Sequence, residues 1–441
     1  MNSLLSAVLA VFPETVQVND RNRLVLGGLD ANDLAAEFGT PLYVFDEATL
    51  RSQCAAFIGE FTSRYPDTSI IYASKALSNK PFLRIIQEEG LGLDVVSLGE
   101  LAIARAAGFP IDRVYFHGNN KGAAELSQAV EWSIGRVVVD NFHELQLLES
   151  LTNKAGRRLD ILLRISPGVD PHTHRHTTTG IVDSKFGFAL ANGDAEEAVR
   201  VAQAAASLDL IGIHAHLGSP LFEVEPYQEA IGVLFEFAAG MRDRHGLSLM
   251  EFSPGGGFPI QYTVDQSAPP LADYAEAITS AVRDCAKTHK FDLPHLFVEP
   301  GRAIVGRAGV ALYEVGAIKD IPGVRKYVSV DGGMGDNIRP AIYGAKYEAV
   351  AAGHVDAKET ETVTLSGKYC ESGDILVKDA VLPKLSPGDI VAIPASGAYC
   401  IPMASNYNAN PRPALVLVNN GEARLMQRRE TLEELMQRDV I

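Results

Sequence analysis

The stretch SIIYASKALSNKPFLRIIQEEGLGLDVVS, residues 69–97, contains a complete strand–helix–strand unit. The apolar runs at its two ends are typical of buried strands, and the apolar residues between them recur at intervals of three and four, as in an amphipathic helix. Gly90 closes the helical part, where glycine readily takes the left-handed conformation that ends many helices. The stretch therefore predicts two parallel strands joined by a helix, with Lys75 directly after the first strand.

The same unit recurs along the chain as far as residue 300. Six more apolar runs follow the first two, namely RVYFHG, RVVVDN, DILLRIS, IGIHAHLGS, LMEFSPGGG and HLFVEPG. Eight strand–helix units in one segment predict an α/β fold, a closed TIM-like (β/α)8 barrel. A doubly wound open sheet is the competing fold, but no GxGxxG motif follows an early strand.

After residue 302 the pattern changes to short, β-branched segments separated by Gly, Pro and Asp, such as RKYVSVDGG, ETVTLSG and DIVAIPASGAY. This pattern is typical of an antiparallel β domain. Residues 15–45 also have β character and are expected to complete that domain. We therefore expect a barrel over residues 46–302 and a β-sandwich or β-barrel domain made of residues 1–45 and 303–441.

The composition narrows the class of protein. The chain has 441 residues, a hydrophobic content of 46% and a formal net charge of −16, which argues against nucleic acid and anionic membranes as partners. Four scattered cysteines suit a reducing compartment. The apolar start MNSLLSAVLAVF lacks a basic region and a cleavage site, so a short helix is expected there rather than a signal peptide. We expect no membrane span and a cytoplasmic protein.

Functional side chains of such barrels gather at the carboxyl ends of the strands. Lys75 lies at the first of these ends, the glycines of SPGGGFP (Gly255–Gly257) at the seventh, and Glu299 with Arg302 at the eighth. The glycines allow backbone N–H groups to approach a phosphate, although a tight turn would also explain them. A phosphate site, a lysine and a carboxylate together suggest pyridoxal 5′-phosphate, with Arg302 as a further phosphate contact and His216 packed on the ring.

A histidine cluster, DPHTHRHTTTG at residues 170–180, raises the question of a metal site. The three histidines alternate and would share one face of an extended segment. No cysteine or carboxylate has a defined ligand spacing to them, so a polar active-site loop is the preferred interpretation and no metal is expected.

Taken together, the motifs resemble the pyridoxal-phosphate decarboxylases with an alanine-racemase-like fold, in the group that acts on ornithine, diaminopimelate and arginine. The resemblance runs nearly end to end and rests on YASKAL, GLDVVSLGEL, FHGNNK, DSKFGF, HAHLGS, GGGFP, EPGR, DGGMGDNIRPAIYGA, CESGD and GAYCIPMASNYN. It implies decarboxylation of meso-2,6-diaminopimelate to L-lysine and CO2, the last step of lysine biosynthesis.

The resemblance also implies roles for single residues. Lys75 resembles the lysine that forms the Schiff base with the cofactor, His216 the histidine stacked on its ring and Glu299 the partner of its pyridine nitrogen. The residues that resemble the family's contacts to the cofactor phosphate are Ser219, Gly255, Gly256, Gly257 and Tyr399. In such enzymes a homodimer completes the site, so Cys370 would supply the proton and Glu371 a substrate contact from the partner subunit.

The substrate's distal carboxylate is held in this family by residues that match Arg302, Arg339 and Tyr343, and we prefer this role for Arg302 over the phosphate contact. Tyr399 also counts among the expected substrate contacts. A distal carboxylate suits a bidentate guanidinium, whereas a distal ammonium suits an acidic residue. Arg339 therefore favours diaminopimelate over ornithine or lysine, unless it forms a surface ion pair with Asp336.

The chain departs from the family pattern at Pro220, at Ile181 and at Cys400–Pro402. A decarboxylase of the same fold that acts on lysine, ornithine, arginine or a carrier-bound aminoacyl group is the close alternative. An amino-acid racemase is less favoured, because Glu299 makes the ring a full electron sink. A non-catalytic relative that binds the cofactor is the remaining alternative, although Lys75 and Cys370 are both present.

Overall fold

The computed structural model describes residues 3–169, 179 and 183–440. The chain divides into two compact units. One unit, called the barrel unit below, contains residues 54–259 and 268–301, and the other, the sheet unit, contains residues 1–53, 260–267 and 302–441. The functional division expected from the sequence, with a cofactor-binding segment at 46–302, stays a prediction.

The barrel unit is built around eight parallel strands. They are β5 (Thr68–Ala73), β6 (Gly92–Val95), β7 (Val114–Phe116), β8 (Arg136–Val139), β9 (Leu159–Ser166), β11 (Leu208–His214), β12 (Glu251–Ser253) and β13 (His295–Val298). Their order is β9-β11-β12-β13-β5-β6-β7-β8, and the pairing of β8 with β9 closes the barrel. The short strand β10 (Phe188–Ala189) adds to β9 outside this ring. The predicted (β/α)8 barrel is confirmed, with each strand on an expected apolar run.

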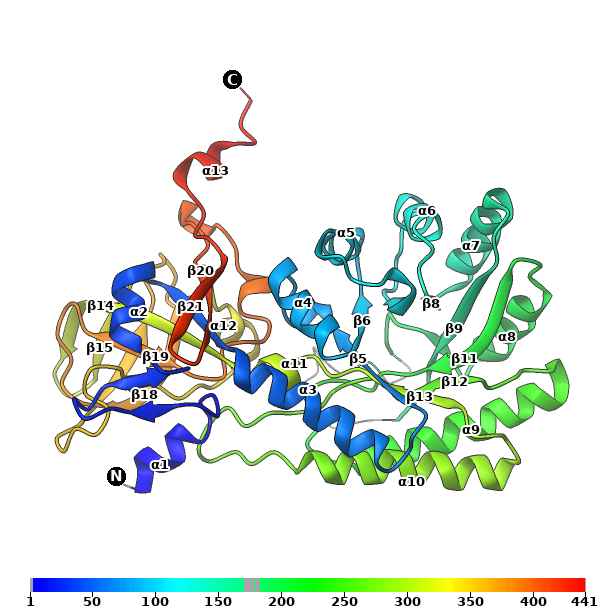
Figure 1. Ribbon diagram of the computed structural model, residues 1–441, viewed down its shortest axis with the longest axis horizontal. Coiled ribbons are helices and arrows are strands. Elements are labelled where there is room, and N and C mark those ends of the chain that lie inside the picture. The colour runs from blue at the N-terminus through cyan, green and yellow to red at the C-terminus, as the bar shows by residue number, and fades with distance from the viewer. Residues whose placement is uncertain (1–2, 170–178, 180–182, 441) are drawn as a thin grey trace. The chain divides into compact units, whose positions relative to one another are not determined.

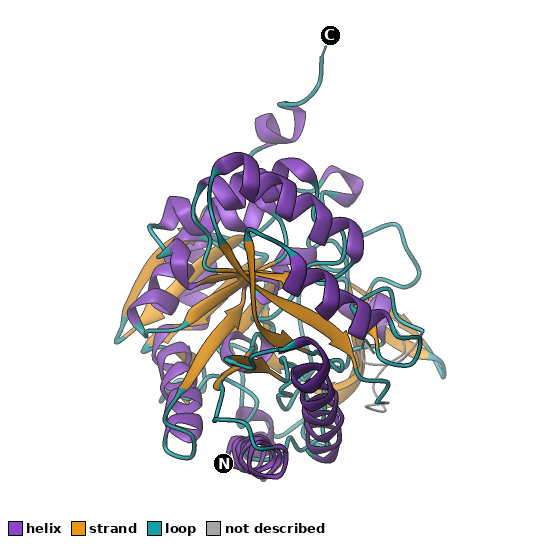
Figure 2. Ribbon diagram, turned by 90° about the vertical axis from the view of Figure 1, so that its right-hand side faces the viewer, coloured by secondary structure: helices purple, strands orange, loops and turns teal. Residues whose placement is uncertain are grey.

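Helices connect the strands and lie outside them, as Figure 2 shows with purple helices around the central orange strands. The helices between the strands are α4 (Lys80–Glu88), α5 (Leu98–Ala107), α6 (Ala123–Glu131), α7 (Phe142–Ala155), α8 (Asp194–Ala204), α9 (Glu225–His245) and α10 (Leu271–His289), and α3 (Glu47–Thr62) precedes β5. Asn79 and Ser97 cap the first turns of α4 and α5 through their side chains. Gly108 and Gly156 end α5 and α7 in the left-handed conformation expected of a C-terminal glycine.

The interior of the barrel is filled by side chains from alternating positions on its strands. One cluster joins Ile71, Tyr115, Val138, Leu162 and Phe297, all of them buried. Each such side chain contributes roughly 1.5–3 kcal/mol by leaving water. The interior of the barrel is therefore a packed core.

The sheet unit contains a sheet whose longest path is β18-β17-β15-β14-β4-β20-β21, with β19 paired to β14 and β16 paired to β19. Its strands are β4 (Leu42–Asp46), β14 (Gly309–Ile321), β15 (Arg325–Val330), β16 (Val350–Ala351), β17 (Glu361–Ser366), β18 (Ile375–Leu382), β19 (Ile390–Ile393), β20 (Ala414–Asn419) and β21 (Glu422–Gln427). Strands β1 (Gln17–Val18), β2 (Leu24–Leu26) and β3 (Leu29–Asp30) form a separate antiparallel sheet. Short helices complete the unit, namely α1 (Ser3–Leu9), α2 (Ala31–Phe38), α11 (Arg302–Val305), α12 (Arg339–Tyr343) and α13 (Leu432–Met436).

The expected β domain and its completion by the N-terminal segment are thus present (Figure 1). One feature differs from a purely antiparallel sheet, because β15 pairs with β17 and β4 pairs with β20 in parallel. Such pairs join strands that are distant along the chain, and a run of β-branched residues does not reveal its partner.

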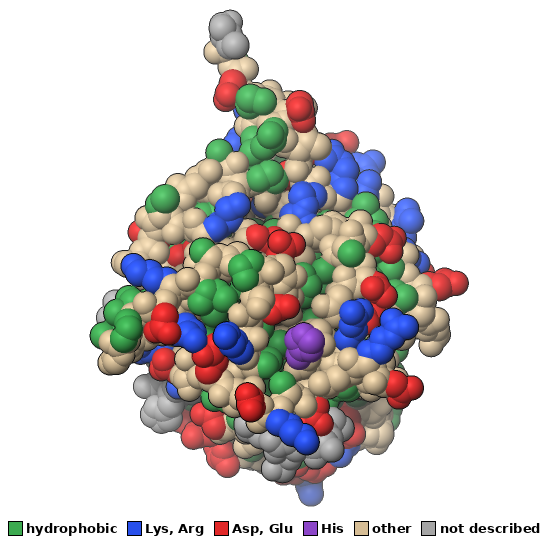
Figure 3. Space-filling model, turned by 90° about the vertical axis from the view of Figure 1, so that its left-hand side faces the viewer, with side chains coloured by type: hydrophobic (Ala, Val, Ile, Leu, Met, Phe, Trp, Pro, Cys, Tyr) green, Lys and Arg blue, Asp and Glu red, His purple; other side chains and the backbone are tan. Residues whose placement is uncertain are grey.

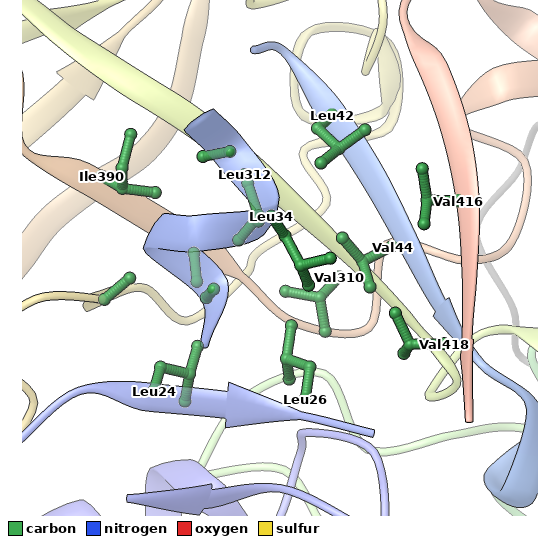
Figure 4. Packing of buried hydrophobic residues seen from close by; sticks show 14 of the residues in the cluster. Leu24, Leu26, Leu34, Leu42, Val44, Val310, Leu312, Ile390, Val416 and Val418 are labelled. Atoms are coloured by element: carbon green, nitrogen blue, oxygen red, sulfur yellow. The ribbon is translucent and has the colours of Figure 1, made fainter. Parts of the chain in front are cut away.

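The core of the sheet unit lies where α2 and β2 meet the inner face of the sheet (Figure 4). Leu34 from α2 packs among Val44 and Val310 from two neighbouring strands, while Leu24 and Leu26 approach from β2. The N-terminal segment therefore contributes both a strand and a cover to the sheet that the C-terminal half forms.

The surface has no concentration of one charge on the face in Figure 3, where Lys and Arg side chains are interspersed with Asp and Glu. In the part of the chain that the structure describes, no helix combines the length and the apolar character needed to cross a membrane.

Candidate active site

Lys75 lies in a short turn directly after β5, at the carboxyl end of the barrel strand. Its side chain is 43% exposed, and its Nζ lies 3.9 Å from Oδ2 of Asp94, which is buried on the neighbouring strand β6. The pairing of Ala73 with Asp94 across β5 and β6 brings the two side chains to the same end of the barrel. A lysine that is accessible yet has a buried carboxylate near it is suited to react with a ligand.

Glu299, the expected partner of a ring nitrogen, follows β13 and is 6% exposed. Its carboxylate lies 3.0 Å from Nε2 of His214 and 3.5 Å from Nε2 of His117. Ser253 also donates to it, at 3.3 Å. Glu299, His214, His117 and Ser253 come from or directly follow four different strands, so the barrel itself assembles this cluster.

The electrostatics of the cluster favour an ionised Glu299. Burial alone would raise the pKa of Glu299, but its contact with His214, which includes a hydrogen bond, outweighs burial and places the pKa well below the usual range. Burial lowers the pKa of His117 well below the usual value and keeps that ring neutral. Burial raises the pKa of Asp94 to about 7, against the lowering effect of Lys75.

Unsatisfied buried atoms in this cluster point to a ligand. His214 Nδ1, His117 Nε2 and Asp94 Oδ1 have no hydrogen-bond partner among the described residues. Buried polar atoms are normally satisfied, so orphaned ones mark a place where a further group can bind. His117, His214 and Glu299 offer ligand atoms within 4.8 Å of one another, an arrangement that could accept a metal ion or a protonated ring nitrogen.

The glycine turn after β12 is tightly enclosed. A Cβ atom would lie 2.4 Å from Ala215 O at Gly255, 2.1 Å from Glu299 O at Gly256 and 2.5 Å from Gly218 O at Gly257. Packing therefore requires glycine at all three positions, and Gly255 and Gly257 have φ of +85° and +112°. The tight-turn interpretation applies to these residues whether or not they also face an anion.

The N–H groups of the turn are not equivalent. Gly255 N donates to Ser253 Oγ at 3.0 Å, and Gly256 N donates to His216 Nδ1 at 3.2 Å. The N–H of Gly257 has no acceptor among the described residues. Of the three, Gly257 is therefore the one whose N–H remains available to a phosphate.

His216 is held by the hydrogen bond from Gly256 N. Its Nδ1 is therefore an acceptor, and the proton of the neutral ring lies on Nε2. Burial lowers the pKa of His216 well below its usual value, which keeps the ring neutral. Thr179 Oγ1 also donates to the backbone carbonyl of His216 at 2.6 Å. The ring is therefore fixed in orientation. Ser219, another expected phosphate contact, is half-buried in the loop after β11.

A second cluster lies within the sheet unit and contains two buried arginines. Arg302 donates to Tyr262 Oη at 2.6 Å, and Arg339 donates to Tyr347 Oη. The Arg339 guanidinium lies 4.9 Å from the centre of the Tyr262 ring and 5.6 Å from that of Tyr347. No carboxylate forms an ion pair with Arg339 in the described part of the chain, so a surface ion pair with Asp336 is ruled out.

The side chains around the two arginines are uncharged. Burial raises the pKa of Tyr347 and of the Cys400 thiol, whose sulfur lies 3.7 Å from Tyr347 Oη. Tyr399, with φ of +66°, places its ring 5.0 Å from the Arg302 guanidinium. Tyr343 is half-buried at the end of α12. Tyr262, Tyr347 and Cys400 were not assigned from the sequence, because nothing in their neighbourhood marks them as partners of an arginine.

Cys370 and Glu371 lie apart from these contacts on an exposed turn of the sheet unit. Cys370 N donates to Asn408 Oδ1 at 3.2 Å, and Tyr407 Oη donates to the Glu371 carboxylate. Their exposure leaves both side chains accessible to another molecule.

The structure thus groups Lys75 with Glu299, His216 and the glycines in the barrel unit, and Arg302 with Arg339 and Tyr399 in the sheet unit. His117 and His214 lie in the apolar runs RVYFHG and IGIHAHLGS, but the sequence does not mark them as partners of Glu299. The histidine cluster within residues 170–180 and the departure at Ile181 lie outside the described residues.

Comparison with known proteins agrees with this geometry. Residues 48–306 match the family model described as pyridoxal-dependent decarboxylase, pyridoxal binding domain. The diaminopimelate decarboxylase of Bacillus subtilis (strain 168) is 47% identical, over 97% of this chain and 97% of the relative. That of Mycobacterium tuberculosis (strain CDC 1551 / Oshkosh) is 40% identical, with both chains covered completely.

Solved structures show the same similarity. The diaminopimelate decarboxylase of M. jannaschii, solved also in complex with L-lysine, matches with a TM-score of 0.91 and 35% identity, over 97% of this chain and 98% of that one. A lysine/ornithine decarboxylase from Vibrio vulnificus matches with a TM-score of 0.74 over 88% of this chain and 97% of its own, but at 24% identity it shows only a shared fold.

Proposed function

The chain belongs to the pyridoxal-dependent decarboxylases, and we propose that it converts meso-2,6-diaminopimelate to L-lysine and CO2. The family match and near-full-length similarity to named diaminopimelate decarboxylases support the reaction. The observation that carries the choice of substrate is Arg339, a buried guanidinium whose contacts are neutral side chains.

The residues of the barrel unit fit pyridoxal phosphate. Glu299 is ionised and lies among orphaned histidine atoms, which suits the protonated ring nitrogen, and the free N–H of Gly257 suits the phosphate. Lys75 would hold the cofactor covalently and Ser219 would be a further phosphate contact, while Gly255 and Gly256, which leave no room for a Cβ atom, would keep the backbone of the turn close to the phosphate. Tyr399 of the sheet unit is proposed as another phosphate contact. When bound, the cofactor accepts the electron pair that the departing carboxylate leaves behind.

The remaining residues of the barrel unit tune this chemistry. Glu299 would place a negative charge close to the ring nitrogen and would so favour the protonated form of that nitrogen. His216, fixed through Gly256, presents a neutral ring to stack on the cofactor. Asp94 lies near Lys75 and could balance the charge of its ammonium.

The sheet unit supplies the residues proposed for substrate recognition. A carboxylate of diaminopimelate that does not react can take two parallel N–H bonds from a guanidinium, and such charge-assisted pairs are roughly twice as strong as neutral hydrogen bonds. Arg339 is oriented by Tyr262 and Tyr347, and Arg302 by Tyr262. We propose these arginines, with Tyr343 and Tyr399, for the distal end of the substrate.

The proton that replaces CO2 would come from Cys370, and Glu371 would contact the substrate, both from the partner subunit of a homodimer. Their exposure within the protomer supports this assignment, since a group that acts in another subunit must be accessible. We also propose a cytoplasmic location, because none of the four cysteines forms a disulfide.

Replacing Lys75 by alanine tests the cofactor and the reaction together. Protein supplied with pyridoxal phosphate should show a visible absorption band and release CO2 from meso-diaminopimelate, and Lys75→Ala should lose both. Lys80→Ala, an exposed lysine at the start of α4, is the matched control and should keep both. A Lys75→Ala protein that retains the band and the turnover would contradict the assignment.

A further inference from the structure

We propose that Asp374 and Asn408 are positioning residues that fix the turn at residues 367–374, which carries Cys370 and Glu371. The inference rests on the proposed function, in which Cys370 supplies a proton and Glu371 contacts the substrate. The contacts of Asp374 and Asn408 would give this exposed turn a defined conformation before a substrate or a partner subunit binds.

Asp374 supports the turn from inside. The residue is 3% exposed, and its two carboxylate oxygens each accept one backbone N–H. Met334 N donates to Oδ1 at 2.6 Å and Tyr369 N donates to Oδ2 at 2.8 Å. Each oxygen is therefore committed to a different segment, one of which immediately precedes Cys370.

Two glycines leave room for the Asp374 carboxylate. A Cβ atom at Gly367 would lie 2.2 Å from Asp374 Oδ2, and one at Gly333 would lie 2.5 Å from Oδ1. The two glycines thus allow the chain to close around the carboxylate. Such close packing leaves Asp374 little freedom to leave the turn for another partner.

Backbone bonds close the same turn on itself. Gly367 N donates to Asp374 O at 2.9 Å, Asp374 N donates to Glu371 O at 3.1 Å, and Glu371 N donates to Tyr369 O at 2.8 Å. The backbone and the Asp374 side chain therefore hold both ends of the segment that contains Cys370 and Glu371.

Asn408 supports the turn from the other side. Its Oδ1 accepts the N–H of Cys370 at 3.2 Å, so it contacts the backbone of the proposed proton donor directly. Asn408 has φ of +51°, a left-handed conformation that asparagine and glycine tolerate better than other residues. The neighbouring Tyr407 stacks on Tyr369 with ring centres 6.0 Å apart and donates to Glu371.

The consequence for the reaction follows from geometry. A proton donor is effective only within hydrogen-bond reach of the atom it protonates, and small displacements reduce the rate steeply. Neither Asp374 nor Asn408 needs to touch the substrate, since each acts through the position of Cys370. Loss of either should therefore lower kcat more than it raises KM.

A double-mutant cycle tests the proposal. Asp374→Asn keeps the size of the side chain but turns an NH2 group toward one of the two N–H donors. We expect it to lower kcat for meso-diaminopimelate by about 10- to 100-fold, since a buried donor loses its acceptor. In a Cys370→Ala background the same change should alter kcat less than about twofold, because residues acting as one unit are not additive.

Asn408 gives a second, independent variant. Asn408→Gly removes the acceptor yet keeps the left-handed backbone, so it should reproduce the loss of kcat, and Asn408→Asp should restore much of it. Asp46→Asn is the control for general destabilisation, because Asp46 is also buried in the sheet unit and accepts the Thr49 N–H at 2.7 Å. It should lower the thermal midpoint and leave kcat unchanged.

The results distinguish the proposed role of Cys370 from the proposed positioning role of Asp374 and Asn408. A Cys370→Ala protein with normal kcat would remove the proposed role of Cys370 and this inference with it. A slow Cys370→Ala combined with additive losses for Asp374→Asn and Asn408→Gly would overturn the positioning role alone. If Asp374→Asn fails to fold, the Asn408 pair carries the test. In every variant the visible band of the bound cofactor should persist.

Discussion

Replacing Arg339 by lysine separates its charge from its shape. Lysine keeps the positive charge but loses the planar fork that can give two parallel bonds to a carboxylate. In the structure the guanidinium is buried, lies 4.9 Å from the centre of the Tyr262 ring and 5.6 Å from that of Tyr347, and donates to the Tyr347 hydroxyl. A lysine can occupy part of this space but can replace only one of the bonds.

The magnitude follows from the bonds that are lost. One charge-assisted hydrogen bond to the substrate carboxylate contributes about 1.5–3 kcal/mol. At about 1.4 kcal/mol for each factor of ten, kcat/KM for meso-diaminopimelate should fall by about 10- to 150-fold. Because the distal carboxylate does not react, the loss should appear mainly as a raised KM.

Steady-state kinetics of CO2 release measures the effect, with Arg325→Lys as the matched control. Arg325 lies 5.9 Å from the Tyr327 ring centre in the same unit, so it undergoes the same chemical change at a partly exposed cation–π contact. The control should leave kcat/KM unchanged. A folded Arg339→Lys protein whose kcat/KM stays within twofold of the wild type would refute the carboxylate-binding role.

Three further predictions follow from the described contacts. Glu299→Gln removes the charge beside His214 and should lower kcat by about 100-fold or more while the protein stays folded, as steady-state kinetics and circular dichroism can show; an unchanged kcat would contradict the ring-nitrogen role. Burial raises the pKa of Asp336 to about 6, so the stability that its protonated form contributes is complete below about pH 4 and is lost as the pH rises through 6. Between these pH values the free energy of unfolding, measured with urea, should fall by roughly 3 kcal/mol more in the wild type than in Asp336→Asn. An equal dependence on pH in both proteins would be inconsistent with the raised pKa. Gly256→Ala places a Cβ atom 2.1 Å from Glu299 O and should lower the thermal midpoint sharply, whereas Gly232→Ala, which meets nothing within 4 Å in helix α9, should not; equal midpoints would refute the enclosure of the turn.

The sequence was sufficient for the barrel because its strands are short apolar runs with helical segments between them, a local signal that does not depend on distant partners. Lys75, Gly255 and Glu299 could be placed at the ends of strands for the same reason, since each follows such a run directly. The order of strands in the sheet unit was not accessible, because the parallel pairing of β4 with β20 joins segments far apart in the chain.

Within the site, the sequence indicated residue types but not their hydrogen bonds. The histidines of IGIHAHLGS were visible at a strand end, yet His214 faces Glu299 whereas His216 accepts from Gly256. Likewise, GGG indicated close backbone approach, but only the structure shows that Ser253 and His216 already take two of the three N–H groups. Such partners depend on side-chain direction across strands, which periodicity does not specify.

The most direct test of the proposed reaction is product analysis by mass spectrometry. Purified protein with pyridoxal phosphate would be incubated separately with meso-diaminopimelate, L-lysine, L-ornithine and L-arginine. We predict L-lysine from meso-diaminopimelate and no amine product from the other three. An amine formed from one of those three, with no lysine from meso-diaminopimelate, would contradict the proposed substrate and the role given to Arg339.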